Sequence, residues 1–359
     1  MATSERIVDE NGDIYEGETH EGVPHGTGIY EFGDGSGQRY AGQFMNGAFH
    51  GAGAMRGPGA SYEGQWHQAA RHGSGTLERT LGDGTTTRYA GEWRNNKKHG
   101  KGEWTDAEGS YHGVWGDGNL THKECRAIMV QSFGGPEVLQ MGTKAIPEPQ
   151  EAQIQIHLAA SGVNPSDTYQ RLGPLGPWAA MPHLLPQIPF TPGKDGAGVV
   201  TAVGPGCSSG LQVGDRVYCA GALTGTMAEY CVCNERTVYP LPAAMSFEQG
   251  ACVGVPCATA YRALLQRGGA TNGECVFIHG ASGAVGLAAT QLARAEGCFV
   301  VGSAGSEAGV EAVKTAGANA VVNHRQEGYL EEAKAALRAA EGQPSGFALV
   351  LEMAVTGTW

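Results

Sequence analysis

The sequence predicts a multidomain chain: an all-β array of repeats, then a compact β domain, and finally a partial α/β domain. Three observations predict this order. Tyr-x-Gly triplets recur through the first 120 residues, strand-like segments separated by Gly and Pro follow, and a strand, a glycine-rich turn and a helix succeed one another from residue 274. With 359 residues, the chain is long enough for two or three domains.

The composition excludes several classes of protein. Hydrophobic residues make up 41% and charged residues 17%, which is typical of a globular chain rather than a disordered one. The net charge of −12 argues against a general nucleic-acid binder. Nine cysteines at irregular spacings do not form a disulfide framework. Because the N-terminus also lacks a signal-peptide pattern and no apolar run could span a membrane, we expect a cytoplasmic protein.

The first 120 residues carry an ordered repeat. The Tyr-x-Gly triplet begins at Tyr15, Tyr40, Tyr62, Tyr89 and Tyr111. His-Gly-x-Gly follows ten residues after each of the first four tyrosines, at His25, His50, His72 and His99. An aromatic residue stands four positions after four of the five tyrosines, at Phe44, Trp66, Trp93 and Trp115. A fixed offset kept four times indicates a stacked array.

The spacing predicts one β-hairpin per repeat. A tyrosine and the aromatic residue four positions later lie on the same face of a strand, since side chains alternate. Glycine supplies turns and lets strands approach closely, and Asp34-Gly35 and Asp83-Gly84 are turn signals between the units. A single hairpin cannot bury its aromatic residues, whereas stacked neighbours can. We therefore expect an all-β array over residues 10–118.

This region resembles the MORN repeat, most closely at residues 62–66 (Tyr-Glu-Gly-Gln-Trp) and 89–93. The resemblance implies an interaction module with a protein or membrane partner. The alternative is that the Tyr, Trp and His side chains serve packing alone. A metal site at the repeated histidines is not expected, because they would be spread along the array.

The middle of the chain predicts a compact β domain from about 125 to 245. Strands are expected at Ala152–Leu158 and, further on, at residues 198–203, 216–219 and 228–232. Cys231 and Cys233 are interpreted as strand cysteines on opposite faces, without partners that would make a metal site.

Residues 161–169, 192–200 and 214–217 resemble three stretches of the medium-chain dehydrogenases, whose first domain is GroES-like. Zinc-dependent members place a Cys ligand where this chain has Asn164, and His-Glu where it has Lys194-Asp195. A catalytic zinc needs about three protein ligands, and no metal site is expected. The resemblance, which includes residues 258–264, implies the zinc-free quinone oxidoreductase branch, whose members are zeta-crystallin-like.

Residues 246–359 predict an incomplete Rossmann domain. Glu274–His279 is a short buried strand, residues 280–286 form the turn Gly-Ala-Ser-Gly-Ala-Val-Gly, and Leu287–Glu296 has helical periodicity. A strand, a glycine turn and a helix in this order place a pyrophosphate at the helix N-terminus, where N–H groups are unpaired. The alternative is a glycine turn without a ligand.

The cofactor is predicted to be NADPH. An NAD site places Asp or Glu near the end of the second strand, but here residues 303–306 read Ser-Ala-Gly-Ser after the strand at 298–302. The missing acid leaves room for a 2′-phosphate, and Arg325 could supply positive charge. A solvated Arg325 is the alternative.

The resemblance also implies the roles of individual residues. Tyr169 would lie near the nicotinamide and is the candidate catalytic residue, although it could instead be a core aromatic residue. Thr259 would lie near the nicotinamide too, while Gly305 and His324 would approach the adenosine side, unless His324 is only a cap. The pyrophosphate would be lined by Ser282, Gly283, Ala284, Val285 and Gly286.

Phe347–Met353 is expected to be the fourth Rossmann strand, after which relatives continue with at least two more strands. We therefore expect a reductase that is truncated at its C-terminus and turns over poorly. The predicted function is NADPH-dependent reduction of quinones or related enones and carbonyls by hydride transfer without zinc, with a small-molecule substrate. The rival hypothesis is a MORN-based scaffold carrying a catalytically impaired reductase remnant. Whether the chain is an active enzyme is left open.

Overall fold

The computed structural model describes residues 3–107, 109–340 and 346–353. These described residues form two compact units, one of those up to 127 together with 142–146, and the other of 128–141 together with those from 147 onward. The predicted order of architectures is confirmed: an all-β array precedes a compact β domain and a parallel α/β domain. Among the described residues, no helix is both long and apolar enough to cross a membrane.

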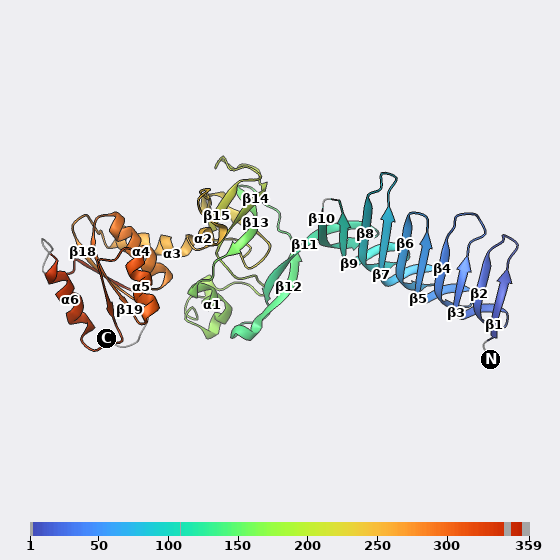
Figure 1. Ribbon diagram of the computed structural model, residues 1–359, viewed down its shortest axis with the longest axis horizontal. Coiled ribbons are helices and arrows are strands. Elements are labelled where there is room, and N and C mark those ends of the chain that lie inside the picture. Colours follow the sequence, from blue (N-terminus) through green and yellow to red (C-terminus); the bar gives the residue numbers. More distant parts are fainter. Residues whose placement is uncertain (1–2, 108, 341–345, 354–359) are drawn as a thin grey trace. The chain divides into compact units, whose positions relative to one another are not determined.

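The first unit is a single antiparallel meander of twelve strands, each paired with the next in the chain (Figure 1). Its hairpins follow one another as the repeat predicts. The strands are β1 (Thr3–Val8), β2 (Ile14–His20), β3 (Val23–Glu31), β4 (Arg39–Met45), β5 (Ala48–Gly57), β6 (Ala60–His67), β7 (Ala70–Thr80), β8 (Thr86–Arg94), β9 (Lys97–Asp106), β10 (Gly109–Gly116), β11 (Asn119–Val130) and β12 (Leu139–Ala145).

The repeated aromatic residues form the core of this array. In the three central repeats, the tyrosine meets two aromatic rings edge to face, one from its own repeat and one from the next. Tyr62, for example, lies 5.0 Å from Trp66 and 5.3 Å from Trp93 between ring centroids. Tyr89 repeats the arrangement with Trp93 and Trp115. Each hairpin therefore supplies half of its neighbour's core, as expected of a stacked array.

The repeated glycines make room for the tyrosine rings. Gly42 pairs directly with Gly53 across β4 and β5, and the Tyr40 ring lies over both. A Cβ at Gly53 would stand 2.1 Å from the Tyr40 hydroxyl oxygen, which is closer than any real contact. Three further repeats have the same cross-strand glycine pairs. Glycine is thus required for the aromatic core, beyond its use in turns.

The second unit begins with the GroES-like part. Its five-stranded antiparallel sheet has the order β16-β13-β14-β15-β17 and a core of Ile, Val and Cys side chains. The last of the strands predicted for this region begins two residues later than expected. The elements are α1 (Pro165–Leu172), β13 (Gln153–Ser161), β14 (Asp195–Val203), β15 (Arg216–Ala220), β16 (Tyr230–Asn234) and β17 (Val238–Pro240), with short 3₁₀ turns at Pro136–Val138, Gly173–Leu175, Pro182–Leu184 and Glu235–Thr237.

The prediction for Cys231 and Cys233 is wrong. Both side chains are fully buried on the same face of β16, with their sulfur atoms 3.8 Å apart, and Cys219 of β15 joins them. Residues two positions apart on a strand share a face. The expectation of opposite faces therefore misapplied the strand period.

The α/β part is a parallel sheet in the order β20-β19-β18-β21. Apolar clusters lie on both faces, one with α4 and one with α6. The strands predicted at Glu274–His279, at residues 298–302 and at Phe347–Met353 are all present here. The elements are α2 (Phe247–Ala251), α3 (Gly254–Tyr261), a π-helical segment (Arg262–Arg267), β18 (Cys275–His279), α4 (Ala284–Ala295), β19 (Phe299–Ala304), α5 (Glu307–Thr315), β20 (Ala320–Asn323), α6 (Tyr329–Ala339) and β21 (Leu349–Glu352).

Candidate functional site

The glycine turn connects the carboxyl end of β18 to the start of α4. Gly280 has a φ of +72°, which favours glycine, and Gly283 is the N-cap residue without a side-chain cap. A Cβ at Gly286 would lie 2.6 Å from Cα of Ala281. Only glycine therefore lets the first helical turn rest on the strand. The free N–H groups of that turn form an anion-binding position.

Ser303, near the end of β19, holds the turn in place. Its buried hydroxyl accepts a hydrogen bond from N–H of Gly280 at 3.1 Å, and its carbonyl accepts one from N–H of Ala281. The hydroxyl also lies 3.2 Å from Nδ1 of His324. Ser303, which stands where an acid was sought, thus stabilises the glycine turn.

Gly305, His324 and Arg325 come together beside this turn, although β20 separates them in the chain. A Cβ at Gly305 would lie 2.7 Å from Nε2 of His324 and 3.0 Å from Nε of Arg325. Burial, the nearby His279 and the Arg325 guanidinium lower the pKa of His324. Because the lowered pKa keeps His324 neutral, the exposed Arg325 guanidinium is the group that carries positive charge beside the turn.

A second histidine at this edge was not predicted. Nδ1 of His279, the last residue of β18, lies 2.9 Å from a carboxylate oxygen of Glu352 at the end of β21. The Tyr329 hydroxyl is 3.5 Å from its Nε2. These groups meet because parallel strands place their carboxyl ends at one edge. The sequence signal is a polar residue ending an otherwise apolar strand.

Tyr169 and Thr259, the two residues predicted near the nicotinamide, lie on helices α1 and α3 and not at the glycine turn. Tyr169 is half-buried on α1, and its ring meets Trp178 edge to face at 5.8 Å. Thr259 is exposed on α3, a helix that packs on α4. Among the described residues the structure gives no contact of either side chain with the glycine turn. Ser282, Gly283, Ala284 and Val285 do lie together at that turn. Their binding roles stay predictions.

Asn164 and Asp195 stand where zinc-dependent dehydrogenases have zinc ligands, and here they belong to a buried polar cluster. Nδ2 of Asn164 donates to Oδ2 of Asp195 at 2.9 Å, and N–H of Val255 donates to the same oxygen. The other oxygen of Asp195 is buried without a hydrogen-bond partner. Burial raises the pKa of Asp195, against the lowering effect of those two hydrogen bonds. An amide, an ammonium at Lys194 and one carboxyl group do not fit a catalytic zinc.

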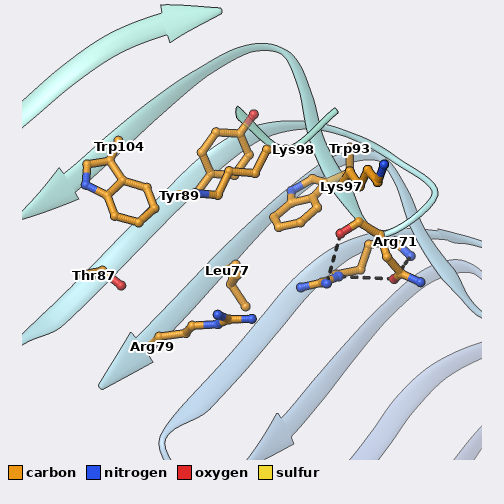
Figure 2. A pocket seen from close by; sticks show the side chains of 11 residues that line it. Arg71, Leu77, Arg79, Thr87, Tyr89, Trp93, Lys97, Lys98 and Trp104 are labelled. Atoms are coloured by element: carbon orange, nitrogen blue, oxygen red, sulfur yellow. Dashed lines mark hydrogen bonds between the residues drawn. The ribbon is translucent and has the colours of Figure 1, made fainter. Parts of the chain in front are cut away.

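A groove crosses the repeat array in the first unit. It consists of two adjoining hollows of about 220 Å³ and 380 Å³. Both hollows are lined by Arg71, Leu77, Arg79 and Asn96. The smaller one is also lined by Trp93, Lys97, Lys98 and Trp104 (Figure 2). The groove draws on several consecutive repeats, which explains why no single motif predicted it.

Aromatic rings hold the cations in this groove. The Arg71 guanidinium lies 4.5 Å from the Trp93 ring centroid and donates a hydrogen bond to the Asn96 carbonyl oxygen (Figure 2). The Lys98 ammonium lies 3.8 Å from the Trp104 ring centroid. Burial and the charge of Arg79 lower the pKa values of Arg71 and Lys98. Among the described residues neither side chain forms an ion pair. The groove is thus positively charged on an acidic protein.

Family models match three parts of the chain. Residues 15–37, 40–59, 62–80 and 89–111 match the MORN repeat. Residues 150–243 match the alcohol dehydrogenase GroES-like domain, and residues 284–358 match the model described as zinc-binding dehydrogenase. The order of these matches is the predicted order, although the exact domain boundaries stay predictions.

Similar proteins resemble the second part of the chain. The quinone oxidoreductases of Pongo abelii and Homo sapiens are 46% and 45% identical over 213 residues, which cover 59% of this chain and 62% of each relative. A mycobacterial structure solved with NADPH is 31% identical with a TM-score of 0.52, covering 60% of this chain and 63% of that one. An NAD-dependent alcohol dehydrogenase structure is 30% identical with a TM-score of 0.54, covering 60% and 67%. The chain thus spans less than two thirds of the quinone oxidoreductases it matches.

Proposed function

The chain combines MORN repeats with a second part that belongs to the medium-chain dehydrogenase family, and from this premise we propose that it reduces quinones or related enones and carbonyls with NADPH. The observation that supports the proposal is a group of residues at the carboxyl edge of the parallel sheet: the glycine turn at residues 280–286, Gly305, His324 and Arg325. We call this group the cradle. Its glycine turn presents N–H groups at the start of α4, and Arg325 lies beside Gly305 near this turn, which supports a role in binding a 2′-phosphate. The similarity to quinone oxidoreductases supports the substrate class.

The cradle residues fit a nicotinamide dinucleotide. The N–H groups at the start of α4 would hold the pyrophosphate, as Gly283 leaves that surface without a side chain. Gly305 would leave room for the ribose, with His324 and Arg325 beside it. When bound, NADPH supplies the hydride. The protein supplies position, exclusion of water and a proton donor.

The protein groups that would act on the substrate are polar but do not form a metal site. Tyr169 is the proposed proton donor to the reduced carbonyl oxygen, since a phenol can donate where no metal polarises that oxygen. The hydrogen bonds of Asn164 and Val255 to Asp195 would keep α3 fixed against the GroES-like sheet. No step in this proposal passes through zinc.

This function predicts acceptor-dependent oxidation of NADPH by the purified chain. With small quinones as acceptors, NADPH absorbance is expected to fall at least ten times faster than it does without an acceptor. Replacing Tyr169 with Phe is expected to lower kcat more than KM, and Tyr239→Phe serves as a matched control on an exposed tyrosine. NADPH binding without any acceptor-dependent oxidation would favour the scaffold hypothesis instead.

The groove supports a second function for the same chain, binding of an acidic extended segment of a partner protein. Arg71 and Lys98 are half-buried in the hollow, where their charged groups lie against Trp93 and Trp104, while Arg79 and Lys97 are exposed. Cations beside aromatic rings suit an extended chain that carries carboxylates and apolar side chains. An anionic membrane surface would meet the exposed cations but not the half-buried Arg71 and Lys98. The proposed partner is therefore a protein.

Binding at the groove is expected to depend on charge. The probe is a labelled peptide of alternating Glu and Leu residues, and a Lys-Leu peptide of the same length is its control. Fluorescence anisotropy should show binding of the acidic peptide only, weakening as salt rises. Arg79→Glu should weaken it severalfold, whereas Arg56→Glu, an exposed position outside the groove, should not. Equal effects of the two variants, or preference for anionic vesicles, would contradict this assignment.

A further inference from the structure

Three buried cysteines of the GroES-like sheet lie within reach of one metal ion. Cys231 and Cys233 stand on β16, and Cys219 stands on β15, which is three places away in the sheet order. All three sulfur atoms lie within 4.8 Å of one another, and all three residues are fully buried. The sheet therefore curves far enough to bring side chains from non-adjacent strands together.

The separations between the sulfur atoms fit metal coordination. For metal–sulfur bonds of about 2.3 Å, sulfur atoms lie about 3.8 Å apart in a tetrahedral and about 4.0 Å apart in a trigonal planar arrangement. Cys231 and Cys233 already show 3.8 Å. Small rotations of the Cys219 side chain would complete the set. No disulfide joins these cysteines, so all three thiols are available.

The surroundings favour one thiolate in this cluster. Hydrogen bonds from Cys231 and Cys233 lower the pKa of Cys219 well below its usual value. The hydrogen bonds to Cys219 and burial raise the pKa values of Cys231 and Cys233, so these two thiols stay protonated without a cation. A cation would offset the charge of further thiolates in a core of Ile and Val side chains, while the displaced protons go to water.

We propose that Cys219, Cys231 and Cys233 form a binding site for a soft, thiophilic cation, with copper(I) as the preferred ion. Soft sulfur ligands select copper(I) and zinc over harder cations. Structural zinc takes four protein ligands almost always, and among the described residues only these three cysteines form such a group. Three sulfur ligands in a dry core suit the ion that accepts trigonal coordination. Such an ion would tie β15 to β16 and close the sheet.

The test uses the full chain, reduced and metal-free, with copper(I) added as its acetonitrile complex. Competition with a chromogenic copper(I) chelator is expected to give one ion per chain. Cys231→Ala is expected to weaken binding at least tenfold. Cys298→Ala is the matched control, because Cys298 is equally buried but lies in the α/β part. Its binding should equal that of the unaltered chain.

Two further measurements keep the result independent of folding. X-ray absorption of the copper-loaded chain should show three sulfur neighbours, and the melting temperature of the unaltered chain should rise with copper(I), as binding to the folded state requires. A nitrogen- or oxygen-containing ligand set, the absence of stoichiometric binding, or equal binding by Cys231→Ala and Cys298→Ala would overturn the proposal. The proposed reductase activity would be unaffected by any of these outcomes.

Discussion

Replacing Gly286 with valine is expected to abolish dinucleotide binding. Gly286 is buried in the first turn of α4, where a Cβ would lie 2.6 Å from Cα of Ala281 and 2.7 Å from its carbonyl carbon and oxygen. These are backbone atoms of the turn and cannot rotate away, so the helix must move off β18. Its free N–H groups move with it. Losing two hydrogen bonds to a charged phosphate, at about 1.5–3 kcal/mol each, corresponds to more than about a hundredfold in Kd.

Isothermal titration with NADPH measures this effect, and Gly346→Val is the control. Gly346 lies in the same α/β part, and a Cβ there meets nothing within 4 Å. Far-ultraviolet circular dichroism of both variants shows whether the α/β part still folds. Gly286→Ala separates the two causes further, because its single methyl group should give a smaller loss. A Kd of Gly286→Val within threefold of the unaltered chain would mean that the pyrophosphate lies elsewhere.

The repeat array was predictable because its information is local and periodic. The tyrosines and the aromatic residues four positions later fixed which face is buried. The structure adds a detail that the sequence also carried: each of the first four tyrosines is followed at the third position by Glu or Gln. The Tyr62 hydroxyl donates to the Gln65 carbonyl oxygen, and the Gln65 side chain accepts from N–H of Ser74. These bonds explain the Glu and Gln positions, and the same periodicity could have revealed them.

Contacts between side chains on strands that are far apart in the sequence could not be predicted from periodicity. Cys219 meets Cys231 only because the GroES-like sheet curves, and nothing in the spacing of 12 residues along the chain reports that curvature. The groove likewise needs Arg71 and Lys98 to project from different hairpins into one hollow. Hydrophobic periodicity predicts elements and buried faces, whereas the order of strands decides which polar groups meet.

The candidate cofactor site contains features of both kinds, some predictable from the sequence and some not. The strand, the glycine turn and the helix are adjacent in sequence, so their arrangement followed from the residues. The hydrogen bonds from Gly280 to Ser303 and between His279 and Glu352 required the strand order β20-β19-β18-β21. The missing acid after β19 was visible in the sequence, but its replacement by a serine that holds the phosphate turn was not.

NADPH is expected to bind more tightly than NADH, and Arg325→Ala is expected to remove most of the difference. Ser303 has its hydroxyl engaged by Gly280 and His324, so no acid at the end of β19 repels a 2′-phosphate. The Arg325 guanidinium is exposed beside Gly305, where it can reach that phosphate. A charge-assisted hydrogen bond of about 1.5 kcal/mol, the low end suited to an exposed group, corresponds to about tenfold in Kd.

Fluorescence titration of both dinucleotides, at low and at high salt, measures the ratio of the two Kd values. Arg338→Ala removes an exposed positive charge on α6 and controls for net charge alone. Because NADH lacks the 2′-phosphate, its Kd should stay constant in both variants, while the Kd of NADPH should rise only in Arg325→Ala. Equal affinity of the unaltered chain for the two dinucleotides, or tighter NADH, would show that Arg325 is merely solvated.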